Sequence, residues 1–288
     1  MPIDRDLAMS AELEPSSCHY GPDDVILYHL GIGAGHGATA TQPGELEYTF
    51  EKNLKVLPTF SLVASKNTSS GGTDLGSIPG IDIDLRALLH GEQEIELHKP
   101  LPTSANFSLE TVVEEVYDKG KAALLVLANT ARDELGEALF TTRMGLFVRG
   151  EGGFGGESGP RSEVTRPDRD PDGSVDVPTR GEQALLYRLS GDKNPLHVDP
   201  EFSRMAGFDV PIIHGLCSYG LACKAVVDNV LDGEVERVAR YSARFAGVAY
   251  PGETYSVSWW VDSDKIVVEA KSRDRDSLVI SNAAIWTR

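Results

Sequence analysis

The sequence predicts an α+β fold in which antiparallel sheets wrap around buried helices. Residues 215–231 are apolar on almost every side, which is typical of a helix inside a core rather than on a surface. Runs rich in β-branched and aromatic residues follow that stretch, and similar runs occupy the first half of the chain. The chain has 288 residues and 41% apolar residues, which is enough for a large core.

A glycine- and proline-rich stretch divides the chain. The run Gly150–Gly156 is followed by four prolines among charged and small polar residues: Pro160, Pro167, Pro171 and Pro178. This composition is typical of a linker or long connection. We therefore predict an N-terminal domain at 1–149, a linker at 150–180 and a C-terminal domain at 181–288.

Each half is predicted to contain a buried helix followed by four antiparallel strands. In the first half the expected strands are 94–97, 107–117, 122–130 and 140–149. In the second half, apolar residues at helical spacing predict a helix over 182–189, before the buried helix at 215–231. Four strands should follow at 238–245, 253–261, 265–271 and 278–286.

The two halves are similar to each other. Residues 24–31 resemble residues 183–190 at an offset of 159 and share a Leu-Tyr-x-Leu core. At the same offset, small residues of the first half face polar residues of the second: Gly33 opposite Asp192, Gly35 opposite Asn194 and Ala38 opposite His197. We interpret this as a degenerate duplication with one competent site, although so short a similarity also arises by chance.

Charge and composition exclude several classes of function. A formal net charge of −17 argues against nucleic acid as a partner. An anionic ligand would need a local basic patch, and Arg237, Arg240 and Arg244 are one candidate, although they are equally well solvated charges on a strand. We expect no membrane span and no signal peptide, and the three cysteines favour a reduced, cytosolic compartment.

Three familiar kinds of site are also argued against. The glycines of 31–38 fit a relaxed dinucleotide fingerprint, but the sequence after them cannot form the helix that this site requires. The seven histidines and three cysteines have no paired ligand spacing, so we expect no metal site and no cofactor. A Gly-x-Ser-x-Gly nucleophile elbow is absent.

The most informative segment is 187–200, which reads Tyr-Arg-Leu-Ser-Gly-Asp-Lys-Asn-Pro-Leu-His-Val-Asp-Pro. The Asn194-Pro195 step favours a turn between Asp192 and His197, and a turn can direct both side chains into one cleft. A carboxylate beside an imidazole is suited to moving protons near neutral pH. The alternative interpretation is a surface turn closed by a His–Asp hydrogen bond.

A second motif, residues 211–220, begins the buried helix. The first amides of a helix have no acceptor within the helix and carry partial positive charge. The amide of Gly215 is therefore a candidate for holding a carbonyl oxygen on which negative charge develops, and glycine leaves the approach open. A simple helix start explains Gly215 equally well when it is taken alone.

These motifs resemble the MaoC-like, or hydratase 2, family of (R)-specific enoyl-CoA hydratases. The Gly-Asp-x-Asn-Pro-Leu-His motif is intact at 191–197, and His214-Gly215-Leu216-Cys217 and 243–254 match two further blocks. Residues 150–156 resemble the connecting segment of the two-domain forms, such as the hydratase part of peroxisomal multifunctional enzyme type 2. The resemblance implies a double hot-dog fold, in which a curved sheet wraps a central helix, and a homodimer.

The resemblance also implies an activity and a set of roles. Water would add reversibly to a trans-2-enoyl-CoA to give the (3R)-3-hydroxyacyl-CoA, with a long or bulky acyl group, such as a sterol side chain, accommodated by the first half. Asp192 and His197 would do the acid–base work, Asn194 would orient the water or the acid, and the Gly215 amide would hold the thioester oxygen. Four residues are expected to bind substrate: His214, Arg244, Phe245 and Gly252.

Three other functions remain open on the sequence. The nearest is a 3-hydroxyacyl dehydratase acting on acyl carrier protein thioesters, which uses the same chemistry. A catalytically silent acyl-thioester binding or scaffold subunit is the second, and the intact Asp192, Asn194 and His197 argue against it. A thioesterase is the third, but it has no reason to keep the whole motif. The segment Tyr250-Pro251-Gly252 is also compatible with a plain turn.

Overall fold

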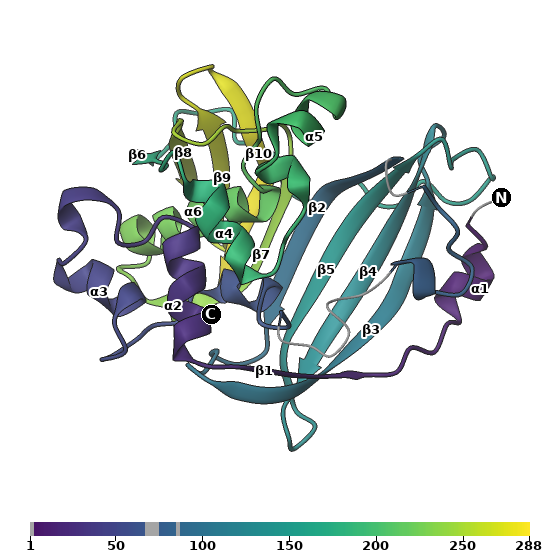
Figure 1. Cartoon of the computed structure of the whole chain (residues 1–288), viewed down its shortest axis with the longest axis horizontal. Helices are drawn as coiled ribbons and strands as arrows, with labels where there is room; N and C mark the ends of the chain where they lie inside the picture. The colour runs from purple at the N-terminus through teal and green to yellow at the C-terminus, as the bar shows by residue number, and fades with distance from the viewer. Residues whose placement is uncertain (1–2, 67–74, 85–86) are drawn as a thin grey trace.

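The computed structural model describes residues 3–66, 75–84 and 87–288, and its strands form one ten-stranded antiparallel sheet (Figure 1). The first-half strands are Ser16–Tyr20 (β1), Leu88–Leu97 (β2), Ala105–Asp118 (β3), Ala122–Arg132 (β4) and Ala138–Arg149 (β5). The second-half strands are Gly173–Pro178 (β6), Val238–Phe245 (β7), Thr254–Val261 (β8), Lys265–Ser272 (β9) and Ser277–Thr287 (β10). The strand order is β1-β3-β4-β5-β2-β7-β10-β9-β8-β6.

The strand order contains an internal repeat. Counted inward from its own edge, the first half reads β1-β3-β4-β5-β2 and the second half reads β6-β8-β9-β10-β7, which is the same order. The halves join where β2 pairs with β7, from Glu92 opposite Arg244 to Glu96 opposite Arg240. The predicted α+β class and duplication are therefore confirmed, with the refinement that the two expected sheets are continuous.

Two equivalent helices also pack against each other. Helix α2 (Pro22–Gly31) belongs to the first half, and α4 (Gln183–Tyr187), continued by a 3-10 turn at Arg188–Ser190 (η5), belongs to the second. The guanidinium of Arg180 donates to the main-chain oxygens of Leu30 and Ala34 at the end of α2. The Leu30 oxygen also accepts from the amide of Gly33, and Ala34 lies three residues beyond α2, so the second half adds hydrogen bonds where α2 ends.

Helix α6 (Gly215–Val230) is the central helix of the second half and lies against β7–β10 (Figure 1). It is buried over most of its length, as its apolar sequence predicts. Its few polar groups are paired: the Ser218 hydroxyl lies 2.7 Å from that of Tyr255, and the Tyr219 hydroxyl donates to the main-chain oxygen of Tyr241. The helix predicted at 215–231 is confirmed.

The first half does not repeat this helix within the described residues. The apolar run after Val56-Leu57 forms a five-residue 3-10 helix, Pro58–Leu62 (η2), whose Phe60 is fully buried. The Ser61 hydroxyl bonds the main-chain oxygen of Pro58, a local alternative to helical hydrogen bonding. The expectation of a buried helix followed by four strands in each half is thus wrong for this part of the first half.

Two separate apolar clusters cover the first-half sheet instead. One, which includes Phe107 and Phe140, is continuous with the core around α6. The other packs helix α1 (Arg5–Met9) and residues 75–83 against β3, β4 and β5 through Val116, Leu125 and Leu146. In Figure 1, α1 lies at the end of the sheet away from α2 and α4.

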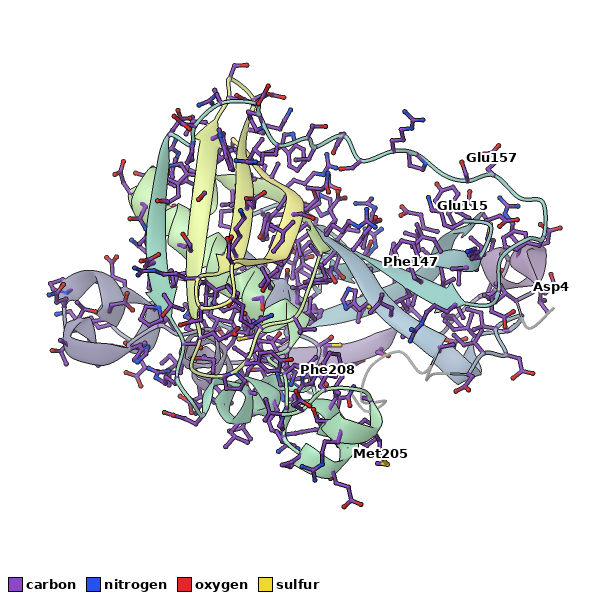
Figure 2. All side chains as sticks on the ribbon, turned by 90° about the horizontal axis from the view of Figure 1, so that it is seen from above. Asp4, Glu115, Phe147, Glu157, Met205 and Phe208 are labelled. Carbon is purple, nitrogen blue, oxygen red and sulfur yellow. The ribbon has the colours of Figure 1, made fainter. Side chains whose placement is uncertain are left out.

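Several elements were not predicted. They are α1, β1, α3 (Pro43–Thr49), β6 and α5 (Pro200–Met205). Strand β6 lies inside the segment predicted as a linker, where its short alternation around Val175 and Val177 is surrounded by linker-like sequence. Helix α5 projects from the body, and the side chain of Met205 at its end is 74% exposed (Figure 2). Among the described residues, no helix has the length and apolar character that crossing a membrane requires.

The buried ammonium group of Lys224 links α6 to α3 through an ion pair. Lys224 on α6 is 9% exposed and pairs with Glu45 of α3 at 2.9 Å and with Asp228 at 2.7 Å. Its ammonium also lies 4.7 Å from the centre of the Tyr48 ring. A charge buried this deeply is stable only when it is paired.

Lys224→Ala should lower the free energy of unfolding by about 2–3 kcal/mol, because it removes charge-assisted hydrogen bonds and leaves partly buried carboxylates unpaired. Urea unfolding would measure the change. Lys52→Ala, at an exposed position just after α3, is the matched control and should have no effect. Equal unfolding midpoints for the two variants would contradict this interpretation.

Candidate active site

The loop between α4 and α5 is shaped by its own side chains. Gly191 has a φ of 129°, which an L-residue rarely adopts, and its backbone packs beside Lys66. The main-chain amide of Asn194 then donates to Oδ1 of Asp192 at 3.0 Å. The side-chain oxygen of Asn194 accepts from the amide of Leu196 at 3.0 Å and begins a 3-10 turn at Pro195–His197 (η6). Asn194 thereby positions both Asp192 and His197.

A hydrogen bond to the main chain fixes the orientation of the His197 ring. Its Nδ1 donates to the main-chain oxygen of Ile212 at 2.9 Å, and the residue is 8% exposed. With the proton on Nδ1, the neutral ring keeps a lone pair on Nε2. The adjacent amide of Ile213 donates to the main-chain oxygen of Ala249 at 2.8 Å, so the segment that receives His197 is itself fixed.

His214 lies behind His197 rather than in the open part of the site. The two rings stack with centroids 3.7 Å apart and an angle of 26° between their planes. Nε2 of His214 lies 3.4 Å from the main-chain oxygen of Asp192, and the centres of the His214 and Tyr187 rings are 4.8 Å apart. His214 therefore supports the catalytic loop, and its predicted role in binding substrate is not favoured by this position.

The fold brings Asp192, His197 and His214 together. One ligand-type atom from each lies within 4.8 Å of the other two, and Asp192 is exposed while both histidines are buried. Such groups also occur in metal sites, where ligands converge on one ion. Here one nitrogen of each ring lies within hydrogen-bonding distance of a main-chain oxygen, that of Ile212 for His197 and that of Asp192 for His214. The arrangement also fits a carboxylate and an imidazole acting on the same small molecule.

Burial keeps both imidazoles neutral. Desolvation is the largest cause that lowers the pKa of His197 below its ordinary value, and hydrogen bonding to Ile212 only partly offsets it. Desolvation and the nearby His197 lower the pKa of His214 to about 4. A neutral His197 is in the form that accepts a proton.

The start of α6 offers free amides beside this pair. The amides of Cys217 and Ser218 donate to the main-chain oxygen of His214, whereas within the described residues those of Gly215 and Leu216 have no protein acceptor. Gly215 is exposed, and a side chain at this position would lie 3.3 Å from the Phe245 ring. The structure thus brings the predicted residues Asp192, His197, Gly215 and Phe245 into one region.

Two predicted substrate residues are not brought there. Strand alternation on β7 places Arg244 on the opposite face of the sheet from Phe245 and exposes it. Gly252 has a φ of 90° in a turn that the Thr179 hydroxyl closes by accepting from its amide at 3.0 Å. This favours the plain-turn interpretation of 250–252.

The proposed basic patch is not a free patch either. Arg240 contacts Glu94 and Glu163, and Arg237 pairs with Glu234 at 3.8 Å. Arg240 also lies 4.1 Å from the ring centre of Trp286. These contacts favour the alternative that Arg237, Arg240 and Arg244 are charges on a solvated surface.

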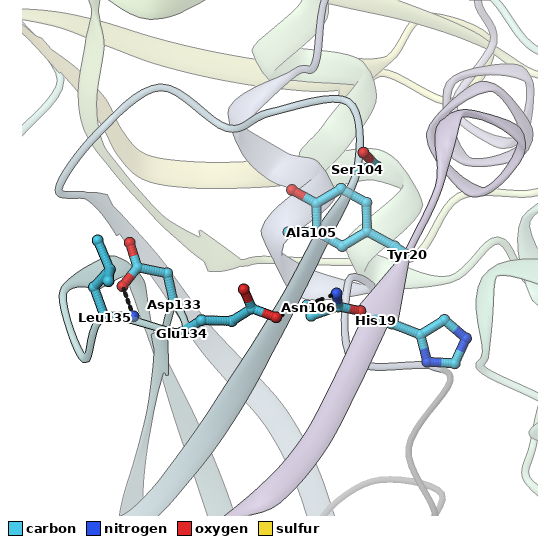
Figure 3. A pocket seen from close by; sticks show the side chains of 8 residues that line it. All are labelled: His19, Tyr20, Ser104, Ala105, Asn106, Asp133, Glu134 and Leu135. Atoms are coloured by element: carbon cyan, nitrogen blue, oxygen red, sulfur yellow. Dashed lines mark hydrogen bonds between the residues drawn. The ribbon is translucent and has the colours of Figure 1, made fainter.

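A hollow elsewhere on the surface does not compete with this region. It has a volume of about 450 Å³ and lies beside β1, lined by Tyr20, Asn106 and Glu134 among others (Figure 3). Its acid Asp133 is already paired with Lys99 at 2.9 Å and accepts from main-chain amides of its own turn. His19 and Glu134 also line the hollow, but its residues lie outside the motifs at 187–200 and 211–220 that carry the predicted chemistry.

Comparisons with known proteins agree with this geometry. Residues 18–150 match the MFE-2 hydratase 2 N-terminal domain, and residues 162–283 match the MaoC-like domain. The chain is 45% identical to the enoyl-CoA hydratase ChsH3 of Mycobacterium tuberculosis, over 97% of both chains. This chain belongs to the MaoC-like hydratase 2 family.

Solved structures agree with the family fold. A MaoC-like dehydratase of Phytophthora capsici matches with a TM-score of 0.87 at 29% identity, over 98% of both chains. A second Mycobacterium tuberculosis protein, described as having a double hot-dog fold, matches with a TM-score of 0.56 at 12% identity over 99% of this chain and 98% of its own. The predicted double hot-dog fold is confirmed.

The buried histidines make stability depend on pH. Desolvation lowers the pKa of His29, His90 and His214 from 6.5 to about 4. In the unfolded chain each histidine has its ordinary pKa of 6.5. Between the folded and unfolded pKa values, the unfolded chain therefore binds protons that the native protein does not. The stability that depends on these histidines being neutral is fully present above the unfolded pKa. It is lost as the pH falls toward the folded pKa.

We therefore expect the urea midpoint to decrease as the pH is lowered from about 7 to about 5. Proton resonances of the His214 ring should show no titration in that range. A midpoint that stays constant, or a His214 ring that titrates near its ordinary pKa, would contradict the burial of a neutral imidazole.

Proposed function

We propose that this protein is an (R)-specific 2-enoyl-CoA hydratase, a hydro-lyase that adds water reversibly to trans-2-enoyl-CoA to give (3R)-3-hydroxyacyl-CoA. The observation that carries the proposal is the convergence of Asp192 and the neutral His197 near the amide of Gly215, which has no acceptor in the described part of the chain. Membership of the hydratase 2 family and the name of the Mycobacterium tuberculosis relative support the same reaction.

The site residues have two tasks in this reaction: to transfer protons and to stabilise the negative charge that develops on the thioester oxygen. Asp192 and His197 hold the water that attacks C3, and one of them takes its proton as the new C–O bond forms. The electron pair of the double bond moves toward the thioester, whose oxygen becomes negative and is held by the Gly215 amide. The acid–base pair then returns a proton to C2, so that water is added without net change in the enzyme. No metal or redox cofactor is needed, because the thioester itself makes C2 acidic.

We further propose that the acyl group is long or bulky, as in fatty acid or steroid degradation. The first half carries the five-residue η2 and two separate apolar clusters in place of a long central helix over the described residues. The two clusters are themselves buried in the core, so it is the short η2 in place of a long helix that supports room for an extended or polycyclic acyl chain. The cytosolic location and the homodimer remain predictions from composition and from the family.

A dehydratase acting on carrier-protein thioesters is the second candidate. The MaoC-like dehydratase of Phytophthora capsici favours it, and the reverse of hydration uses the same acid, base and amide. The carrier distinguishes the two, because the chemistry at C2 and C3 is identical. A silent binding subunit is distinguished by the absence of any turnover.

Asp192→Asn and His197→Gln should each lower kcat for hydration by about 10²–10⁴, because each removes one member of the proton-transferring pair. Loss of the enoyl-thioester absorbance measures the rate, and chiral separation of the product should give the 3R isomer. Asp209→Asn, an exposed acid on the loop after α5, and His98→Gln, an exposed histidine after β2, are matched controls. Retention of activity in either site variant would refute the assigned roles, and formation of the 3S isomer would refute the stereochemistry.

Among enoyl-CoA substrates, kcat/KM should rise from crotonyl-CoA to long-chain and polycyclic side-chain thioesters, because the longer groups bury more apolar surface. The panel should include the same acyl groups on acyl carrier protein. Higher activity on the carrier protein would favour the dehydratase, and the highest activity on crotonyl-CoA would argue against a bulky substrate. No turnover on any member would leave only the binding-subunit interpretation.

A further inference from the structure

His90 comes from the first half, which carries none of the predicted catalytic residues, yet it lies at the catalytic site. It is on β2, and its ring meets the edge of the Phe245 ring with centroids 5.0 Å apart and an angle of 76°. Phe245 in turn lies against Gly215, whose amide is the proposed oxyanion donor. Asp192 is close enough to act on the His90 ring electrostatically.

A β-bulge turns His90 toward this site. Along β2 the side chains of Gln93 and Ile95 face the core, so regular alternation would place that of His90 on the opposite face. The pairing with β5 shifts register between His90 and Glu92, and His90 lies opposite Leu146, which faces the core. Bulges of this kind re-aim side chains and are common beside active sites.

Gly91 makes the bulge possible. A side chain there would lie 2.5 Å from the ring of Phe147, so only glycine fits between the strand and that ring. Phe147 is labelled on the first-half sheet in Figure 2. The sequence His-Gly in this strand therefore directs the histidine inward.

The inward-facing ring has an unsatisfied nitrogen. Nε2 of His90 is buried and has no hydrogen-bond partner among the described residues. Burial lowers the pKa of His90 to about 4. Hydrogen bonding of the ring to the main chain of Glu92 and to the side chain of Gln93, together with the charge of Asp192, only partly opposes the shift. A buried polar atom without a partner costs stability, so such an atom at a functional site is best explained by a partner that arrives with the ligand.

We propose, on the basis of the proposed hydration reaction, that His90 is a catalytic residue whose Nε2–H donates to the thioester oxygen together with the Gly215 amide. The thioester oxygen can only accept, so the ring must meet it as the Nε2–H tautomer. A neutral imidazole suits this task, because it donates without exchanging its proton with the enolate. The first half thus supplies one donor of the oxyanion site, and the second half supplies the other.

His90→Leu should lower kcat by about 10²–10³, the usual effect of losing one oxyanion donor, and should change KM much less. Unfolding stability should not fall, because an unpaired buried nitrogen is replaced by apolar surface. His90→Gln, which restores an N–H donor, should recover much of the lost turnover. His98→Leu is the matched control and should keep full activity, since within the described residues the His98 side chain bonds Thr141, on the other face of the sheet.

Two spectroscopic measurements separate donation from a structural role. With saturated acyl-CoA labelled with ¹³C at the carbonyl, the bound C=O stretch should move to lower frequency in the wild type. The shift should be smaller in His90→Leu and unchanged in His98→Leu. ¹⁵N chemical shifts of the His90 ring in the same complex should report a proton on Nε2.

The outcomes distinguish this inference from the proposed function. Full kcat in His90→Leu, a C=O stretch equal to that of the wild type, or a free Nε2 lone pair in the complex would each overturn the role of His90 while the wild type still hydrates enoyl-CoA. A loss of stability equal to the loss of activity would assign His90 to the fold instead. Absence of hydration by the wild-type protein would be the failure of the proposed function itself.

Discussion

The hydrogen bond from Nδ1 of His197 to the main-chain oxygen of Ile212 links the two parts of the site. It fixes the tautomer that leaves Nε2 free, and it fastens the loop that carries Asp192 to the segment leading into α6. Ile213 donates to Ala249, so this segment cannot move without disturbing the loop before β8 as well. The distance between the acid–base pair and the Gly215 amide is therefore set by hydrogen bonds that end on main-chain groups of residues 212–213 and 249.

Duplication explains why one half holds the acid and base while the other half shapes their surroundings. The strand order is the same in both halves, and pairing of β2 with β7 makes one sheet of the two. This pairing places the core-facing side of β2 next to that of β7, so that a residue such as His90 reaches the site across the join. Once the first copy had lost its own catalytic turn, as Gly33, Gly35 and Ala38 suggest, its strands remained free to contribute single side chains.

Much of this structure could be predicted, because periodicity and local motifs are properties of neighbouring residues. All eight predicted strands and the helix at 215–230 follow from such patterns, and the turn around Asn194-Pro195 was correctly expected to bring Asp192 and His197 together. What failed depended on contacts distant in sequence. The bulge at Gly91 turns the His90 side chain to the core-facing side of the sheet. Strand β6, within the predicted linker, forms because it pairs with the edge of β8. A glycine inside a strand is a signal for a bulge, but it does not tell which side chain the bulge redirects.

Among the described residues, some of the buried polar atoms without a hydrogen-bond partner belong to the segments that form this site: Nε2 of His90, Nδ1 of His214, the Tyr187 hydroxyl and the Ser190 hydroxyl. Each costs stability in the free protein, and packing elsewhere has to offset that cost. The same burial keeps His197 and His214 neutral, which is the state that proton abstraction from water requires. Solvation that satisfied these atoms would also raise the pKa values and screen the field of the α6 amides. The cost in stability and the neutral state of the two histidines therefore have one physical origin, the burial of these side chains, while Asp192 and Gly215 remain exposed to the substrate.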